Sequence, residues 1–193
     1  ITKIKMKALD FDFEKLFKIF ESAITTKVNK KKYNELLVAY SGGSDSTALL
    51  YFANEMARKY KIGVRAVHVN HNLNIESQKW EKHCKEFCKK MQIPIIIKNI
   101  NIQIKTGDSI EERAREKRYE AIKSLITNKT IMMTAHHAED QAETFLYQLF
   151  RGSGVKGLSS MPDFKNLLIG YHARPLLGLS KNTLIDVINF KEF

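Results

Sequence analysis

Two short segments of this chain carry residue types that can bind a nucleotide and act on it. The first lies between an apolar run and a helical pattern, and it consists of Ser41, Gly42, Gly43, Ser44, Asp45 and Ser46. Its glycines let the backbone approach an anion closely, its hydroxyls add donors, and the following helix supplies unpaired N–H groups. We therefore expect residues 41–46 to bind the phosphates of a nucleotide.

Asp45 is the unusual member of this loop. A carboxylate next to phosphates repels them unless a cation lies between, so Asp45 is a candidate ligand of Mg²⁺ on a polyphosphate, directly or through water. The alternative is that residues 41–46 form only a glycine turn and a Ser/Asp helix cap. A Walker loop is excluded, because the pattern GxxxxGKS/T is absent.

The second segment, residues 136–144, opens a predicted helix. At about 100° per residue, three polar side chains fall within an arc of about 60°, namely those of His136, Asp140 and Glu143. The opposite side is apolar and consists of Ala138, Ala142, Phe145, Leu146 and Leu149. We expect the apolar side to pack and the polar side to face the nucleotide, where it could bind Mg²⁺ through Asp140, orient an amine or transfer protons. The alternative is the solvated face of an ordinary helix.

The elements that must position these segments alternate along the chain. Short apolar runs predict parallel strands buried on both faces, at 36–40, 62–70, 94–100 and 130–135. Helical patterns occur at 46–60, 76–92, 109–126 and 138–150, after an amphipathic helix at about 11–28 and before another from about 180. The alternation predicts a doubly wound, mostly parallel α/β sheet flanked by helices, with ligands at the carboxyl ends of the strands. Beyond residue 151 the chain is richer in glycine and predicts looser structure.

Composition narrows the class of protein. The 193 residues are enough for a single domain, and we expect one catalytic domain over 1–193. Because the chain begins with Ile1 and ends inside a periodic segment at Phe193, we expect a fragment of a longer protein with further C-terminal domains. The absence of a long apolar run or leader pattern predicts a cytoplasmic protein.

The charge of the chain indicates a class of partner, and its cysteines argue against a bound metal or cluster. Lys and Arg number 32 against 21 Asp and Glu, a formal net charge of +11, which favours a polyanion such as nucleic acid. The alternative is that the lysines merely solvate the surface. Cys84 and Cys88 do not form a CxxC pair, which argues against a bound metal or cluster and favours reduced, structural thiols.

The phosphate loop resembles the SGGxDS loop of the N-type ATP pyrophosphatase, or PP-loop, superfamily, which has an adenine-nucleotide alpha hydrolase-like fold. The HxxxDxxET pattern at 136–144, with RGSGVKGL at 151–158, is similar to the tRNA(Ile)-lysidine synthetase family. Further similar segments are HVNHNL at 68–73, the helix with Glu111, Arg115, Arg118 and Tyr119, and RPLL at 174–177. The resemblance runs from about 35 to 180. It departs at Asn70 and Asn72, where the family usually has Asp and Gly.

The resemblance implies a ligase that adenylates the wobble cytidine of a tRNA(Ile) with a CAU anticodon and joins L-lysine to it. Its substrates and cofactor would be ATP, lysine, tRNA and Mg²⁺, with no membrane; the oligomeric state is open, a homodimer being one option. Residues 41–46 would hold pyrophosphate and Mg²⁺, with Asp45 and Asp140 as metal ligands. Lysine and metal would be positioned by His136, Asp140 and Glu143.

Three further site residues follow from the resemblance, each with an alternative. His68 and Asn70 would line the adenine pocket, although His68 could equally be a core histidine on a buried strand. Arg115 would contact phosphate or stabilise the adenylate, although it could instead belong to a salt-bridge ladder with Glu111 and Glu112. Arg113 and Arg118 stay open as the true phosphate contact.

Other functions remain alternatives. A tRNA sulfurtransferase of the same superfamily shares adenylation, but it needs a cysteine or a cluster to deliver sulfur. A non-enzymatic RNA-binding α/β domain would bind RNA without ATP turnover, and an amidotransferase-like or NAD synthetase-like ligase would turn over without tRNA. The segment at 152–157 formally matches GxGxxG but follows a helix, so we expect a substrate or tRNA contact there, or a plain surface loop.

Overall fold

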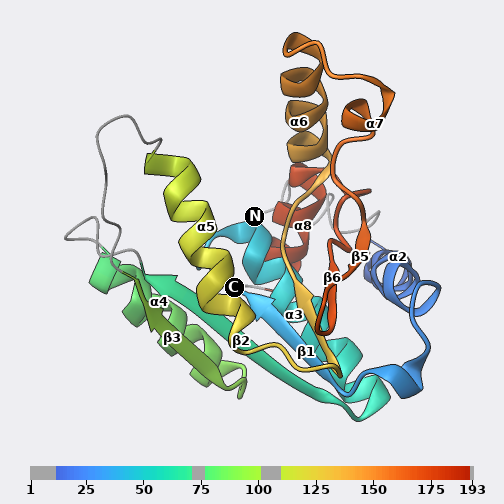
Figure 1. The fold of residues 1–193 in the computed structure, drawn as a ribbon. Coiled ribbons are helices and arrows are strands. Elements are labelled where there is room, and N and C mark those ends of the chain that lie inside the picture. The colour runs from blue at the N-terminus through green and yellow to red at the C-terminus, as the bar shows by residue number, and fades with distance from the viewer. Residues whose placement is uncertain (1–11, 71–76, 101–109, 192–193) are drawn as a thin grey trace, which may run out of the picture.

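A six-stranded sheet forms the centre of the molecule (Figure 1). The computed structural model describes residues 12–70, 77–100 and 110–191, with the backbone alone for Ile110, Glu111, Glu112, Ala114, Arg115 and Lys156. The strands are β1 (Glu35–Ala39), β2 (Gly63–Asn70), β3 (Ile95–Asn99), β4 (Thr130–Met133), β5 (Phe164–Asn166) and β6 (Tyr171–Ala173). Their order is β3-β2-β1-β4-β6-β5, and all neighbours are parallel except β5 and β6. The predicted doubly wound, mostly parallel sheet is therefore confirmed.

The central strands are apolar because both of their faces are covered. In β1, Leu36 and Val38 point into the larger core cluster, whereas Leu37 points into the smaller cluster on the opposite face. Met132 of β4 also belongs to the smaller cluster, and its neighbours Ile131 and Met133 belong to the larger one. This alternation of fully buried side chains is what a continuous hydrophobic run provides in a parallel sheet.

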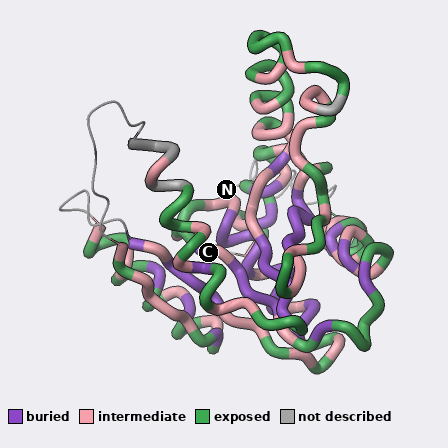
Figure 2. Tube along the Cα trace, viewed as in Figure 1, coloured by how far each residue is buried: buried purple, intermediate pink, exposed green. Residues whose placement is uncertain are grey.

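Helices cover the two faces unequally. The larger cluster receives side chains from α2 (Phe13–Thr25), α3 (Ser44–Tyr60), α4 (Ser77–Lys90) and α8 (Lys181–Phe190). The smaller cluster receives Ile122 from α5 (Ile110–Lys123). Buried positions accordingly concentrate around the sheet in Figure 2. No helix in the described ranges is long and apolar enough to cross a membrane.

The predicted N-terminal helix is confirmed as α2, and aromatic packing docks it onto α3. Phe20 and Phe52 are fully buried, with ring centroids 5.3 Å apart and nearly parallel rings. Phe17 lies 6.5 Å from Phe52 on the same side. Burying a phenylalanine completely contributes about 1.5–3 kcal/mol, so these contacts hold α2 firmly against α3.

Helix α6 (Ala138–Phe150) differs from the expectation in one respect. It occupies the predicted residues, but none of its residues is buried, and Phe145, Leu146 and Leu149 are 41%, 48% and 48% exposed. The helix projects away from the sheet together with α7 (Val155–Leu158), as Figure 1 shows. The expectation that its apolar side packs within this chain was wrong, because no other described element covers that side.

The region beyond residue 151 is also more regular than expected. Besides α7 it contains the β5–β6 hairpin, which extends the sheet beyond β4. The turn of this hairpin depends on Gly170, which has φ +73° and lies directly against the backbone before β4. A Cβ at residue 170 would lie 2.5 Å from Thr127 O and 2.7 Å from Thr130 O.

Replacing Gly170 with alanine should therefore destabilise the fold. An L residue in the left-handed region costs about 1–2 kcal/mol, and the backbone clash adds to this, for an expected total of about 2–4 kcal/mol in the free energy of unfolding. Urea denaturation followed by circular dichroism measures this change. The matched control is Gly178→Ala, since nothing lies within 4 Å of a Cβ there; it should stay within about 0.5 kcal/mol of the parent. Equal unfolding midpoints for the two variants would contradict the assignment.

Candidate functional site

The two segments predicted to carry chemistry meet at one edge of the sheet. Strands β1 and β4 are adjacent and parallel, so the loops that follow them leave the sheet side by side. From β1 the chain order runs outward through β2 and β3 on one side and resumes with β4 on the other. Such a reversal of strand order creates a crevice at the carboxyl ends of the strands, where ligands bind in open α/β sheets.

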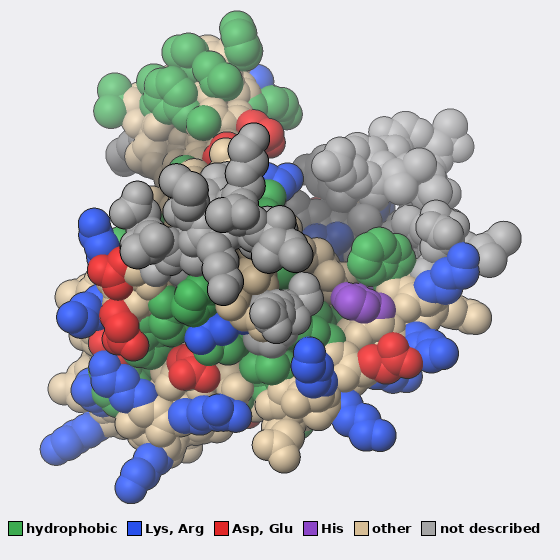
Figure 3. Space-filling model, turned by 180° about the vertical axis from the view of Figure 1, so that it is seen from behind, with side chains coloured by type: hydrophobic (Ala, Val, Ile, Leu, Met, Phe, Trp, Pro, Cys, Tyr) green, Lys and Arg blue, Asp and Glu red, His purple; other side chains and the backbone are tan. Residues whose placement is uncertain are grey.

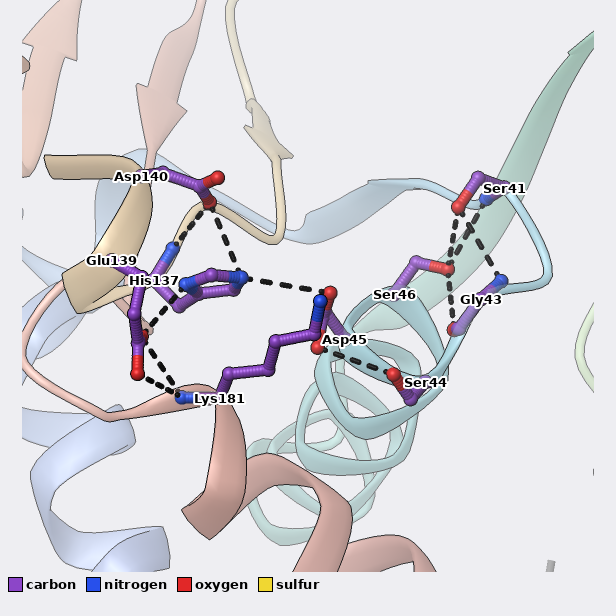
Figure 4. A network of polar contacts seen from close by, with 9 residues as sticks. All are labelled: Ser41, Gly43, Ser44, Asp45, Ser46, His137, Glu139, Asp140 and Lys181. Carbon is purple, nitrogen blue, oxygen red and sulfur yellow. Dashed lines mark hydrogen bonds and ion pairs between the residues drawn. The ribbon is translucent and has the colours of Figure 1, made fainter. Parts of the chain in front are cut away.

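The loop after β1 is held by its own hydroxyl groups. Ser46 Oγ donates to Gly43 O at 3.0 Å and lies 3.0 Å from Ser41 Oγ, while Thr47 Oγ1 donates to Gly43 O at 2.9 Å. Gly43 caps α3 and has no side chain with which to accept hydrogen bonds from the helix (Figure 4). The N–H groups of the first turn of α3 therefore remain suited to an anion, which the helix dipole also favours.

Gly42 is required by both its conformation and its surroundings. Its φ of +89° belongs to the left-handed region, which glycine adopts without steric cost. A Cβ at this position would lie 3.0 Å from Cys84 Sγ and 3.3 Å from His83 Cδ2 on α4. The loop is thus packed directly onto α4.

Asp45 extends from the first turn of α3 toward the loop that follows β4. Its Oδ1 accepts from Ser44 Oγ at 3.3 Å, and its Oδ2 lies 3.7 Å from His137 Nε2. The side chain is 27% exposed, so it can reach a bound ion while it stays fixed at its base.

His137 lies at the centre of the site, although the sequence analysis selected its neighbour. The imidazole is buried, and its Nε2 lies 3.6 Å from Asp140 Oδ2 and 3.7 Å from Asp45 Oδ2. Its backbone N–H donates to Asp140 Oδ2 at 2.9 Å, which is half of a capping box at the start of α6. A polar residue followed three positions later by an acid is a helix-start signal that could have drawn attention to His137.

Glu139 connects this centre to α8. Its Oε2 lies 3.0 Å from His137 Nδ1, an ion-pair distance without the alignment of a hydrogen bond. Both of its carboxylate oxygens accept from the backbone N–H of Lys181, at 3.1 and 3.0 Å. The hydrogen bond from Lys181 is the main cause that lowers the pKa of Glu139, so this carboxylate is charged at neutral pH.

His136 has different contacts. Its Nδ1 lies 2.9 Å from Thr134 Oγ1, which in turn lies 2.9 Å from Nε2 of the buried His172. Burial lowers the pKa of His172 to about 3, with smaller contributions from the charges of Arg174 and His136, so His172 is neutral at physiological pH. Glu143 is exposed on α6. Of the three residues predicted to share a face, Asp140 contacts the centre of the site.

The two residues predicted to line an adenine pocket are both buried at the end of β2. His68 Nδ1 lies 2.9 Å from Tyr40 O and 3.4 Å from Cys84 Sγ. Asn70 Nδ2 donates to Glu81 Oε2 at 3.1 Å. These contacts join β2 to β1 and to α4, which favours the alternative of a core histidine at position 68.

The predicted arginines fall on α5. The predicted phosphate contact of Arg115 falls on a side chain that lies outside the described residues, so it stays a prediction. Arg113 Nη1 lies 3.6 Å from Glu116 Oε2, and Arg118 is exposed.

Oxygen donors for a metal are present, but they do not form a closed site. The carboxylates of Asp45 and Asp140 flank the same imidazole nitrogen. In the part of the chain that the structure describes, no group of three or more His, Cys, Asp or Glu residues could hold a metal ion. Two carboxylates completed by phosphate oxygens and water are the donor set that Mg²⁺ prefers, so these residues fit Mg²⁺ bound together with a nucleotide.

Known proteins share this architecture and sequence. The chain is 49% identical over 134 residues to the tRNA(Ile)-lysidine synthase of Buchnera aphidicola subsp. Acyrthosiphon pisum, a match covering 69% of this chain and 30% of that protein. With the tRNA(Ile)-lysidine synthase of Coxiella burnetii it shares 39% identity over 174 residues, or 90% of this chain and 37% of that protein. The chain thus spans about a third of the length of the curated relatives it matches.

Solved structures show the same fold at low identity. The U34-tRNA thiolase NcsA from Methanococcus maripaludis, solved with its 4Fe-4S cluster, superposes with a TM-score of 0.68 at 17% identity, over 93% of this chain and 65% of that one. The glutamine-dependent NAD+ synthetase from Acinetobacter baumannii gives a TM-score of 0.56 at 14% identity, over 91% and 32%. The family model described as the PP-loop domain matches residues 16–193. The chain, with its glycine loop capping α3 at the switch point of the sheet, therefore belongs to the PP-loop domain family.

Proposed function

We propose that this chain is the ATP-binding catalytic domain of a tRNA(Ile)-lysidine synthase. It would adenylate the wobble cytidine of a tRNA(Ile) with a CAU anticodon and join lysine to it, releasing AMP and pyrophosphate in the cytoplasm. The observation that carries the proposal is the meeting of the phosphate loop with His137 and Asp140, because it places Asp45 3.7 Å from the imidazole at the end of β4. The similarity of most of this chain to proteins named tRNA(Ile)-lysidine synthase supports the proposal.

The first step joins the base to AMP. The carbonyl oxygen of cytidine attacks the α-phosphorus of ATP, and the bond from that phosphorus to pyrophosphate breaks. Negative charge grows on the departing pyrophosphate, and the N–H groups at the start of α3 would stabilise it. Mg²⁺, when bound through Asp45 and Asp140, would neutralise part of the phosphate charge.

The second step replaces AMP with lysine. The lysine ε-amine attacks the activated ring carbon, the carbon–oxygen bond to AMP breaks, and the amine loses a proton. A carbonyl oxygen is a poor leaving group until it is adenylated, which is why ATP must react first. The carboxylates of Asp140 and Glu143 would attract the ammonium group of lysine, and His137 would accept the proton.

His137 holds the two halves of this site together. Nε2 of the buried imidazole contacts both Asp45 from α3 and Asp140 from α6, so it links the two carboxylates. Glu139 Oε2 lies 3.0 Å from the other ring nitrogen. Residues that orient metal ligands in this way commonly change affinity or activity by about 10- to 100-fold when replaced.

A tRNA sulfurtransferase is the second candidate, since a tRNA thiolase shares the fold. The cysteines of this chain disfavour it. Cys84 and Cys88 are fully buried, and burial raises their pKa values to about 11 and about 12. Both thiols therefore stay protonated at neutral pH and are poor carriers of sulfur.

Lysine incorporation tests the function itself. Full-length protein should transfer radiolabelled lysine to a tRNA(Ile) transcript with a CAU anticodon only when ATP is present. A transcript with uridine in place of the wobble cytidine is the matched control and should remain unlabelled. Label that appears without ATP, or equally on both transcripts, would exclude the proposed reaction.

Asp45→Asn should abolish most of the turnover without unfolding the protein. Loss of the carboxylate removes a ligand for the ion that neutralises the phosphates, so kcat/KM for ATP should fall about 10²- to 10³-fold. Pyrophosphate release by the full-length protein measures this change. The control is Asp186→Asn, which alters an exposed carboxylate on α8 and should leave the rate unchanged. Similar rates for both variants would remove Asp45 from the site.

Comparison of two adjacent histidines separates their roles. His137→Gln should lower the same rate about 10- to 100-fold, because the imidazole that positions Asp45 and Asp140 is lost. His136→Gln should cost less than about 3-fold, because His136 Nδ1 lies against Thr134 Oγ1 and this imidazole does not link Asp45 to Asp140. A larger loss for the His136 variant would instead support the site role predicted for His136.

A further inference from the structure

Helix α4 presents an aromatic pair directly beside the phosphate loop. Trp80 is the only tryptophan of the chain and is 51% exposed. Its ring stands perpendicular to that of the exposed His83, with centroids 6.0 Å apart. Trp80 Cε3 lies 3.4 Å from where a Cβ of Gly42 would be, so the tryptophan borders the loop itself. A large aromatic side chain that stays in water next to a reactive site is suited to stack against a flat ligand.

The same helix is strongly basic. It contains five lysines and two glutamates. By helical periodicity, four of the lysines fall within about 100° on the solvent side, namely Lys79, Lys82, Lys89 and Lys90. On the face drawn in Figure 3, an exposed histidine borders a hydrophobic side chain, with lysine and arginine side chains nearby. Aromatic rings interleaved with cations are typical of surfaces that bind single-stranded nucleic acid.

The negative charges on α4 do not cancel this surface. Glu81 is already engaged by Lys85 at 2.6 Å and by Asn70 at 3.1 Å. Glu86 lies 3.9 Å from Lys82, a distance at which an exposed pair contributes little and can be exchanged for another partner.

A base stacked on Trp80 could be the adenine of ATP or a base of an RNA, and the length of the lysine row favours RNA. At 1.5 Å per residue, Lys79 and Lys90 are separated by about 16 Å along the helix. The triphosphate of ATP would occupy the loop at the start of α3, whereas the lysines continue away from that loop. A row of cations of this length matches the backbone of several nucleotides.

We propose that Trp80, with His83 and the lysines of α4, forms a stacking platform for an unpaired base of an RNA substrate beside the phosphate loop. That this RNA is the anticodon loop of a tRNA rests on the proposed function. The platform adds the surface of this chain that holds the loop and the residue that contacts a base.

The test uses the single tryptophan as a reporter. The anticodon stem-loop of tRNA(Ile), as an RNA oligonucleotide, should quench Trp80 fluorescence in this chain on titration, in the absence of ATP and lysine. Anisotropy of labelled RNA should show that Trp80→Ala weakens binding about 5- to 150-fold, as expected for the loss of one stacked base. Trp80→Phe, which keeps an aromatic ring and the packing against Gly42, should recover part of the affinity.

Two controls make the result specific. Phe150→Ala removes an aromatic ring that is 86% exposed on α6 and should leave RNA affinity unchanged. Lys89→Ala should weaken binding less than Trp80→Ala and reduce the slope of log affinity against log salt concentration by about 0.7–1.

Either of two outcomes overturns the proposal. RNA affinity that is unchanged in Trp80→Ala excludes the platform, and a loss of Mg·ATP affinity without a loss of RNA affinity would assign the ring to adenine instead. The binding test does not depend on turnover, so it is separate from the lysine-incorporation test. A protein that binds RNA through Trp80 but does not incorporate lysine would contradict the proposed function and would still support the platform.

Discussion

The site depends on the parallel pairing of β1 with β4. Glu35 pairs with Thr130 and Val38 with Met133, so the two strands end at the same level of the sheet. The loop after β1 then starts α3, and the loop after β4 starts α6, which brings Asp45 and His137 together. At the opposite end Glu35 accepts hydrogen bonds from Arg65 of β2 and from Thr130 of β4, and these bonds tie the three central strands together. A shift of one residue in this register would turn every buried side chain of a strand to the other face.

The sequence predicted the central fold well, because strands buried on both faces are continuous apolar runs. Leu36–Val38 and Ile131–Met133 are completely or almost completely buried. Such apolar runs are visible in the local sequence, without knowledge of the residues that pack against them. Strands β5 and β6 were missed, since three residues each are too few for a periodic pattern and the hairpin is held by pairing to β4. Periodicity also indicated that α6 has an apolar side, but it carries no information on whether another element covers that side.

The loop at 41–46 could be recognised as a candidate phosphate site because the features that define it are local. Glycine conformation, hydroxyl groups and a helix start all lie within six consecutive residues. The spacing pattern did not single out His137, for a definable reason. A spacing of 100° per residue holds only inside a helix, whereas α6 begins at Ala138 and His137 is extended, with φ −124° and ψ −174°. The direction of the His137 side chain toward Asp45 is a consequence of the tertiary arrangement of α3 and α6.

The central claim is that the start of α3 holds the leaving pyrophosphate while Asp45 and Asp140 face it. The most direct measurement is a crystal structure of the chain with Mg²⁺ and an ATP analogue that cannot be cleaved between the α- and β-phosphates. We expect the β- and γ-phosphates to lie against the N–H groups of residues 43–46, with the metal on the carboxylates of Asp45 and Asp140. A triphosphate bound elsewhere, such as on the glycine-rich loop at 152–157, would contradict it.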